Sequence, residues 1–218
     1  HTDALGHRIF NIFNNNFSGK LRITSEGSVK TKDFSGIIKG LKEKVNPSCF
    51  LRQTKLTMPC KKIEQIGRKA KVKGTDLVEF THKLNLLVSE SIIYVGGSTT
   101  TSTSSKEALE QGKGVCQDFA HILISVARLN NLPARYINGF LLDDLNSVEN
   151  STHAWVEIFI EGLGWVAFDP SHQRCIDEKY IRISVGYDFL DASIIKGVKT
   201  NYDGNEILES KVSINNGQ

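Results

Sequence analysis

The stretch GKGVCQDFAHILISVARL at residues 112–129 decides the fold of this chain. Two glycines interrupt the chain just before Cys116, and the residues that follow are apolar on nearly every side of a helix. A helix that is apolar all round lies buried at the centre of a domain. We therefore predict a buried helix over about residues 116–130, with Cys116 in its first turn.

A cysteine in the first turn of a helix has a chemical consequence. The unpaired backbone N–H groups and the positive end of the helix dipole stabilise a thiolate, which is the reactive form of the side chain. The same N–H groups can receive the oxyanion of a tetrahedral intermediate. A buried structural thiol can occupy the same place, however, so the interpretation of Cys116 depends on its partners.

Two partners follow in the sequence. His153 lies in THAWVEIF, which begins a predicted strand, and Asp169 lies in GWVAFDPS, which ends the next one. The thiol, imidazole and carboxylate occur in that order, 37 and then 16 residues apart. An imidazole that a carboxylate orients can generate and stabilise a thiolate. We therefore predict Cys116 as nucleophile, His153 as general base and acid, and Asp169 as the orienting carboxylate.

The register of the two strands matters for this triad. A two-residue turn at residues 162–163 would pair His153 with His172 instead of Asp169. Direct opposition of His153 and Asp169 needs a pairing centred on Glu161, or a β-bulge, and we predict one of these. We expect His172 itself to be a turn residue that faces solvent.

The other elements are predicted from hydrophobic periodicity and from turn residues. Helical character begins near Pro59 and is clearest over 75–90, where Thr75 can cap the helix. Ser104 and Glu107 have the spacing of a capping box for a short helix through Glu110. Strands are predicted at 8–13, 20–24, 134–142, 153–160, 164–169, 180–186 and 206–214.

The motifs GVCQDFAH, PARYINGFL, THAWVEIF, GWVAFDPS and YIRISVGYDF together resemble bacterial proteins of the transglutaminase-like superfamily. The resemblance covers about residues 45–215 and implies an α+β fold, with a papain-like core in which the cysteine helix packs on an antiparallel sheet. It also implies the same three roles for Cys116, His153 and Asp169. Residues 1–35 resemble the end of a small N-terminal β domain, so we predict a linker at 36–58 and a catalytic domain at 59–218.

Other side chains could also take part in the predicted site. Gln111 and Tyr94 are candidate side-chain donors to the oxyanion, beside the Cys116 backbone N–H. A metal site of Cys116, His121 and His153 is disfavoured, because His121 lies five residues along the helix. We therefore expect no metal and no cofactor.

Composition and charge limit the remaining classes of function. The net charge of +3 conceals an asymmetry, because residues 1–75 carry 16 Lys and Arg against 5 Asp and Glu, and the rest of the chain carries 11 against 19. The basic stretch at 61–73 has no interleaved aromatic residue, so we interpret it as a solvated helix face and expect no nucleic-acid partner. No apolar run approaches the length of a membrane span, and we expect no membrane partner.

Cysteine usage and the start of the chain bear on the compartment. Four cysteines without a CxxC pair favour reduced thiols and a cytoplasmic protein, although a Cys49–Cys60 disulfide is sterically conceivable. The chain opens at His1 instead of Met, so we expect that an upstream segment belongs to it.

The expected function is a thiol-dependent enzyme that hydrolyses peptide or side-chain amide bonds through a cysteine thioester. Its expected partner is a peptide or protein substrate, with cell-wall peptide as one candidate. Two alternatives stay open: a protein-glutamine acyltransferase that forms cross-links, and a non-catalytic binding domain that retains the fold.

Overall fold

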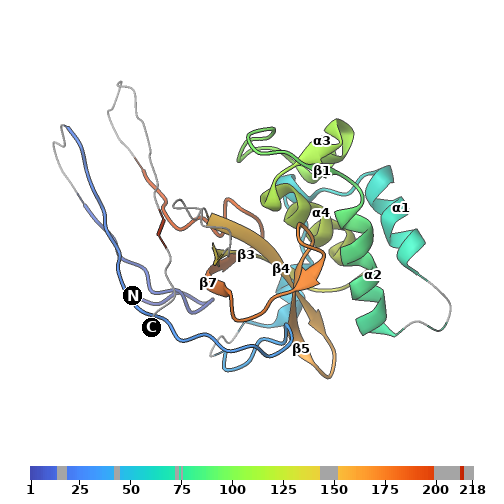
Figure 1. Ribbon diagram of the computed structural model, residues 1–218, viewed down its shortest axis with the longest axis horizontal. Helices are drawn as coiled ribbons and strands as arrows, with labels where there is room; N and C mark the ends of the chain where they lie inside the picture. Colours follow the sequence, from blue (N-terminus) through green and yellow to red (C-terminus); the bar gives the residue numbers. More distant parts are fainter. Residues whose placement is uncertain are drawn as a thin grey trace.

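A five-stranded antiparallel sheet, with helices packed on one face, forms the body of the protein (Figure 1). The computed structural model describes residues 1–13, 19–41, 45–71, 74, 76–142, 152–198 and 212–213. The strand order is β6-β5-β4-β3-β7. The sheet strands are β3 (Ala134–Leu141), β4 (Thr152–Ile160), β5 (Gly164–Asp169), β6 (Arg174–Cys175) and β7 (Tyr180–Gly186). The helices are α1 (Lys61–Ala70), α2 (Leu77–Ser89), α3 (Ser105–Gln111) and α4 (Cys116–Leu129).

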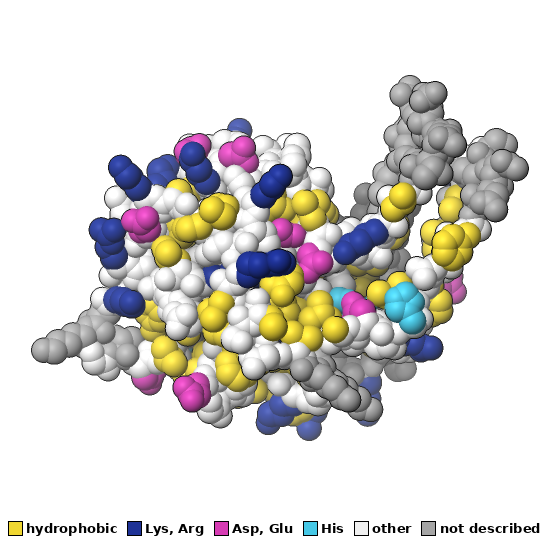
Figure 2. Space-filling view, turned by 180° about the vertical axis from the view of Figure 1, so that it is seen from behind, with side chains coloured by type: hydrophobic (Ala, Val, Ile, Leu, Met, Phe, Trp, Pro, Cys, Tyr) yellow, Lys and Arg dark blue, Asp and Glu magenta, His cyan; other side chains and the backbone are white. Residues whose placement is uncertain are grey.

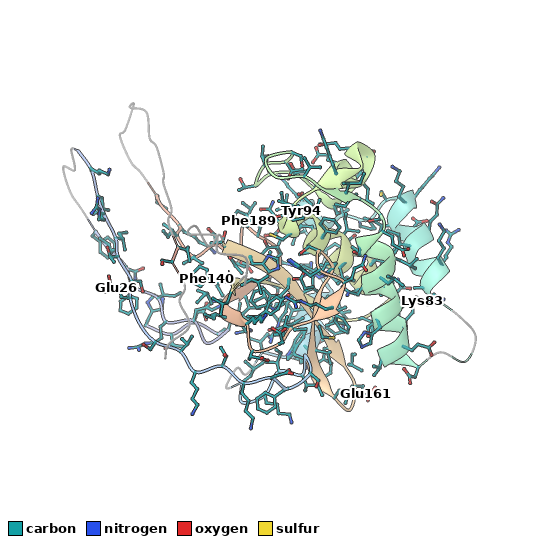
Figure 3. All side chains as sticks on the ribbon, viewed as in Figure 1. Glu26, Lys83, Tyr94, Phe140, Glu161 and Phe189 are labelled. Carbon is teal, nitrogen blue, oxygen red and sulfur yellow. The ribbon has the colours of Figure 1, made fainter. Side chains whose placement is uncertain are left out.

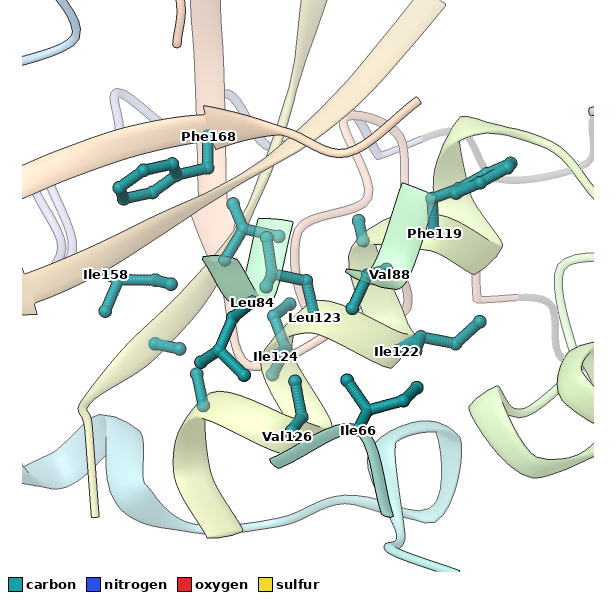
Figure 4. Packing of buried hydrophobic residues seen from close by; sticks show 14 of the residues in the cluster. Ile66, Leu84, Val88, Phe119, Ile122, Leu123, Ile124, Val126, Ile158 and Phe168 are labelled. Atoms are coloured by element: carbon teal, nitrogen blue, oxygen red, sulfur yellow. The ribbon is translucent and has the colours of Figure 1, made fainter. Parts of the chain in front are cut away.

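Helix α4 is the centre of the hydrophobic core. Every residue from 117 to 128 is buried, as its apolar sequence predicts. Helices α1, α2 and α3 pack around α4, and strands β3 and β4 lie against it. Figure 4 shows Leu123, Ile124 and Val126 of this helix among side chains from α1, α2 and the sheet. The predicted α+β arrangement, with the cysteine helix packed on an antiparallel sheet, is confirmed.

The caps of the surrounding helices agree only in part with the sequence. The capping box of α3 is present, since the Glu107 backbone N–H donates to the Ser104 hydroxyl and the Glu107 carboxylate accepts from the Ser104 backbone N–H. For α2 the cap is Asp76, whose carboxylate accepts from the Glu79 backbone N–H at 2.8 Å. Thr75, the residue that the sequence suggested as the cap, comes one position earlier and lies outside the described residues. Both residue types can fill this position, and periodicity fixes a helix start only to within a residue or two.

Different parts of the chain pack on the two faces of the sheet. Along β4 the even-numbered residues from Ala154 to Ile160 belong to the core cluster that contains α4. The odd-numbered Trp155 packs on the opposite face with Ile137 and Tyr180. Leu5 and Ile38 pack against this second cluster, so residues from the N-terminal part of the chain cover the back of the sheet.

The predicted strands at 8–13 and 20–24 are not formed. Residues 8–13 and 20–24 have no strand conformation apart from an isolated bridge between Thr2 and Arg8. Phe10, Ile12 and Leu21 are exposed, and this extended segment leaves the body of the protein (Figure 1). Two strands need further strands or a helix for stability, and the described residues of 1–35 form no sheet that these strands could join. The assignment of 1–35 to a β domain stays a prediction.

The segment predicted as a linker contacts the core over part of its length. Two 3-10 helices, Pro47–Leu51 and Lys55–Thr57, lie in it, and Phe50 is buried. The Arg128 guanidinium of α4 donates to the Thr57 hydroxyl. The predicted boundaries of linker and catalytic domain stay predictions. The strand predicted at 206–214 lies outside the described residues except for 212–213.

The basic stretch at 61–73 forms the outer face of α1 as far as residue 71. This helix buries Ile63, Ile66, Gly67 and Ala70 and exposes its cationic side chains. Arg68 pairs with Glu64 at 3.1 Å one turn earlier. Seen from behind in Figure 2, lysine and arginine side chains are interspersed with acidic and hydrophobic ones. In the described part of the chain, no helix has the length and apolar character needed to span a membrane.

Candidate active site

Cys116 is the first residue of α4, and the loop before it is held by the side chain of Asp118. The Val115 backbone N–H donates to Asp118 Oδ2 at 2.8 Å, and the Thr99 hydroxyl donates to the same oxygen at 2.6 Å. Burial raises the pKa of Asp118, while these hydrogen bonds oppose that shift. A Cβ at Gly114 would lie 2.7 Å from the Asp118 Cβ, so the approach to Cys116 needs a glycine there. Asp118 is not among the site residues predicted from the sequence.

His153 and Asp169 lie in contact within the sheet. His153 Nε2 is 2.7 Å from Asp169 Oδ2, and the Asp169 side chain is fully buried. The contact is the predicted one, but the predicted register was wrong. In the β4–β5 pair Val156 lies opposite Phe168 and Ile160 opposite Gly164, without a shift between them.

The observed register places the turn centre at Gly162 instead of Glu161. Continuing this pairing by one residue puts Asp169 opposite Trp155, two residues from His153 and on the same face of the sheet. Diagonal neighbours of this kind lie within reach of long side chains. The contact therefore needs neither direct opposition nor a bulge.

The imidazole of His153 lies between Cys116 and Asp169. Burial alone would lower the pKa of His153, but hydrogen bonds with Asp169 and Cys116, and the charges of both, raise it above its ordinary value. Because Asp169 engages Nε2, the ring nitrogen left for Cys116 is Nδ1. The raised pKa favours the imidazolium form of His153 beside the Cys116 sulfur, with the carboxylate fixing the ring.

Asp169 collects more hydrogen bonds than a single histidine supplies. Tyr180 donates its hydroxyl proton to Oδ2 at 2.8 Å, and the backbone N–H and hydroxyl of Ser171 both donate to Oδ1. Burial would raise the pKa of Asp169, but the hydrogen bonds of His153, His172 and Ser171 hold it well below its usual range. The carboxylate therefore stays ionised although it is buried.

His172 lies at this site and not simply in a solvent-facing turn. Its Nδ1 is 2.8 Å from Asp169 Oδ2, and its ring centre is 5.2 Å from that of His153. The side chain is 44% exposed, so the expectation of a solvent-facing residue describes only its outer edge. The short sequence distance between Asp169 and His172 was the signal for this contact. Tyr180 carries no such signal, because only the folded sheet brings it near Asp169.

The two candidate oxyanion donors differ in position. Tyr94 belongs to the short strand β1 (Ile93–Tyr94), which pairs in parallel with β2 (Lys113–Gly114) just before Cys116 (Figure 3). Burial raises the pKa of Tyr94, and the charges of Cys116 and Asp169 add to the shift, so its phenol lies within their electrostatic reach. Gln111 is exposed at the end of α3, and the hydrogen bonds of the described residues include none between it and Cys116. Tyr94 is therefore the better placed of the two.

His121 and the state of the cysteines bear on the metal site and the disulfide that the sequence left open. His121 is completely buried, and its Nε2 accepts from the Phe189 backbone N–H at 3.2 Å. Burial lowers its pKa to about 4, which keeps the ring neutral. All four cysteines are free, Cys49 and Cys60 included. Among the described residues, the groups that lie together with metal-ligand spacing are His153, Asp169 and His172.

Comparison with known proteins agrees with this architecture. Residues 64–170 match the family model of the transglutaminase-like superfamily. An uncharacterized protein of Mycobacterium leprae is 37% identical over 110 residues, covering 48% of this chain and 39% of the relative. An uncharacterized protein of Mycobacterium tuberculosis is 30% identical over 148 residues, covering 63% of this chain and 47% of the relative. The chain thus spans less than half the length of these relatives.

Two further relatives have names that state or suggest an activity. A protein-glutamine gamma-glutamyltransferase of Pseudomonas aeruginosa is 33% identical over 67 residues, which is 28% of this chain and 10% of that protein. A crystal structure of a candidate cysteine protease from Cytophaga hutchinsonii superposes with a TM-score of 0.60 at 25% identity, covering 73% of this chain and 53% of the other. The fold of these relatives suggests cysteine-dependent acyl transfer or proteolysis. Through residues 64–170, this chain belongs to the transglutaminase-like superfamily.

Proposed function

We propose that the protein is a thiol-dependent enzyme that hydrolyses peptide or side-chain amide bonds through a cysteine thioester. The observation that carries the proposal is the contact of His153 with Asp169 at 2.7 Å, together with the hydrogen bond with Cys116 that helps to raise the pKa of His153. This is the geometry of a nucleophile, a base and a group that orients the base.

The chemistry follows from the protonation states that this geometry favours. The Cys116 thiolate attacks an amide carbonyl, and the backbone N–H groups at the start of α4, together with the Tyr94 phenol, receive the oxyanion. His153 as imidazolium gives its proton to the leaving amine while the C–N bond breaks, which leaves a thioester and a neutral imidazole. Neutral His153 then takes a proton from water, whose oxygen attacks the thioester. Release of the carboxylic acid restores thiolate and imidazolium.

The first experiment tests the activated thiol. Iodoacetamide should alkylate Cys116 faster than Cys49, Cys60 and Cys175 at neutral pH, as followed by mass spectrometry of tryptic peptides. His153→Ala should slow the alkylation of Cys116 and leave the other three cysteines unchanged, so each sample carries its own control. Equal labelling of all four cysteines would favour the alternative of a non-catalytic domain.

The second experiment separates hydrolysis from cross-linking. Glutamine peptides incubated with a labelled amine should give glutamate or cleaved products faster than amine conjugate, because no described residue forms an obvious amine site beside Cys116. Conjugate as the main product would favour the acyltransferase, an activity described for the Pseudomonas relative. A panel of peptides and peptidoglycan fragments then tests the proposed peptide or protein substrate, with Cys116→Ser as the inactive control.

A further inference from the structure

His172 adds to the site a second imidazole that the proposed hydrolysis does not need. His153, Asp169 and His172 each offer one ligand atom, and these atoms all lie within 4.8 Å of one another. One nitrogen of each imidazole contacts the same oxygen: His153 Nε2 lies 2.7 Å and His172 Nδ1 2.8 Å from Asp169 Oδ2. A single carboxylate oxygen therefore holds two histidine rings close together.

Two imidazoles and one carboxylate are the donor set that divalent first-row transition metals accept, whereas Mg²⁺ and Ca²⁺ prefer oxygen ligands alone. Zinc binds histidine nitrogen and carboxylate oxygen at about 2.0–2.2 Å, so neighbouring ligand atoms of a tetrahedral ion lie about 3.4 Å apart. The two short contacts in the site would have to open by roughly 0.6 Å. His172 can supply the movement for its own contact with Asp169, because it lies in an exposed turn after β5. The contact between His153 and Asp169 has to open by rotation of these two side chains.

The exposure of the three side chains also allows an ion to enter from solvent. His153 and Asp169 are buried, whereas 44% of the His172 side chain is exposed. His172 thus forms the outer ligand, and the two inner ligands come from strands β4 and β5. The Ser171 backbone N–H and hydroxyl donate to the other carboxylate oxygen, Asp169 Oδ1, at 2.9 and 2.6 Å. These hydrogen bonds orient the Asp169 carboxylate as a metal ligand.

We propose that His153, Asp169 and His172 bind a divalent transition-metal ion such as Zn²⁺, and that the bound ion inhibits the thiol chemistry. The ion takes the place of the hydrogen-bonding proton on His153 Nε2. A ring whose Nε2 is bound to metal can carry a proton only on Nδ1, so it cannot become the imidazolium that the leaving amine requires. Binding rests on the geometry alone, whereas inhibition rests on the proposed function.

Cobalt titration tests the binding directly. Co²⁺ added to the reduced, metal-free protein should give visible absorption that saturates at one ion per chain, and Zn²⁺ should displace it. His172→Asn should weaken Co²⁺ binding by at least about tenfold, since it removes a ligand while keeping a side-chain donor for Asp169. His82→Asn on α2 is the matched control, because that histidine is exposed and lies outside the cluster. Circular dichroism establishes that both variants are folded.

Three results would overturn the proposal: no Co²⁺ bound by the wild type, equal affinity in the wild type and His172→Asn, or a spectrum that depends only on Cys116. Zn²⁺ should also slow alkylation of Cys116 in the wild type and much less in His172→Asn, while Mg²⁺ should have no effect. The two proposals fail separately. Uniform labelling of the cysteines without metal would refute the activated thiol and leave the cobalt titration as it stands.

Discussion

His153 and Asp169 meet across a diagonal of the β4–β5 pair, with 2.7 Å between Nε2 and Oδ2. The backbone register, continued by one residue, places Asp169 opposite Trp155 instead. The Trp155 ring stacks on His153, with 6.2 Å between the ring centroids. The imidazole is thus held by the carboxylate at its edge and by an aromatic ring along its face.

Replacing Asp169 by Asn should slow alkylation of Cys116 by about 10- to 100-fold at neutral pH. The substitution keeps the shape of the side chain but removes the charge that favours the imidazolium of His153, an effect of about one to two pKa units for a close carboxylate. The rate is measured with iodoacetamide under pseudo-first-order conditions.

Asp177→Asn is the matched control, because this partly exposed carboxylate pairs with Arg174 at 3.5 Å beside the site. It should leave the rate at Cys116 within about twofold, as expected for a partly exposed ion pair. Equal rates in Asp169→Asn and wild type would show that the carboxylate does not act on the thiol through His153.

Tyr180→Phe should lower both stability and the reactivity of Cys116. The Tyr180 hydroxyl donates to Asp169 Oδ2 at 2.8 Å and accepts from Arg174 Nε at 3.0 Å, so its loss leaves Arg174 without that acceptor and Asp169 with one donor fewer. We expect a loss of about 1–3 kcal/mol in the free energy of unfolding, measured by urea denaturation.

Tyr187→Phe is the control for Tyr180→Phe, because the Tyr187 ring contacts Arg52 through its face, with 4.4 Å from the guanidinium carbon to the ring centroid. This variant should unfold at nearly the wild-type urea concentration and keep the alkylation rate of Cys116. The same loss of stability in both variants would mean that the Tyr180 hydroxyl is not the cause.

Gly114→Ala should disturb the loop that presents Cys116. The added methyl group would lie 2.8 Å from Asp118 Oδ2, the oxygen that accepts from the Val115 backbone N–H. Moving Asp118 costs overpacking strain of about 1–3 kcal/mol and frees the start of α4. Thermal unfolding and Cys116 alkylation should both change. Gly96→Ala, whose added Cβ would meet open space, should change neither.

The sequence predicts local structure well here and long-range contacts less well. Helix α4 and its cysteine follow from apolar residues on all sides after two glycines, because that pattern is local and has few other solutions. The contact of His153 with Asp169 was predicted from the order of motifs, but its register was not, since a turn of one residue more or less changes every pair. Tyr180 joins Asp169 only through the folded sheet, whereas His172 lies three residues from Asp169 in the sequence. Strands at 8–13 and 20–24 need partners that the described residues of 1–35 do not supply.

The stability of the protein should fall as the pH falls from about 6.5 to about 4, in part because of His121. Burial lowers the pKa of this histidine to about 4 from an ordinary value of 6.5, so between these pH values the unfolded chain binds a proton that the folded chain does not. The free energy of unfolding therefore rises with pH across this interval, and the contribution of His121, about 3 kcal/mol, is fully present above it.

His121→Gln should flatten this pH dependence, because its amide oxygen can accept from the Phe189 backbone N–H at every pH. Urea denaturation at several pH values between 4 and 7 measures the slope. His82→Gln, at an exposed position, should keep the wild-type slope, and an unchanged slope in His121→Gln would show that His121 is not the titrating group.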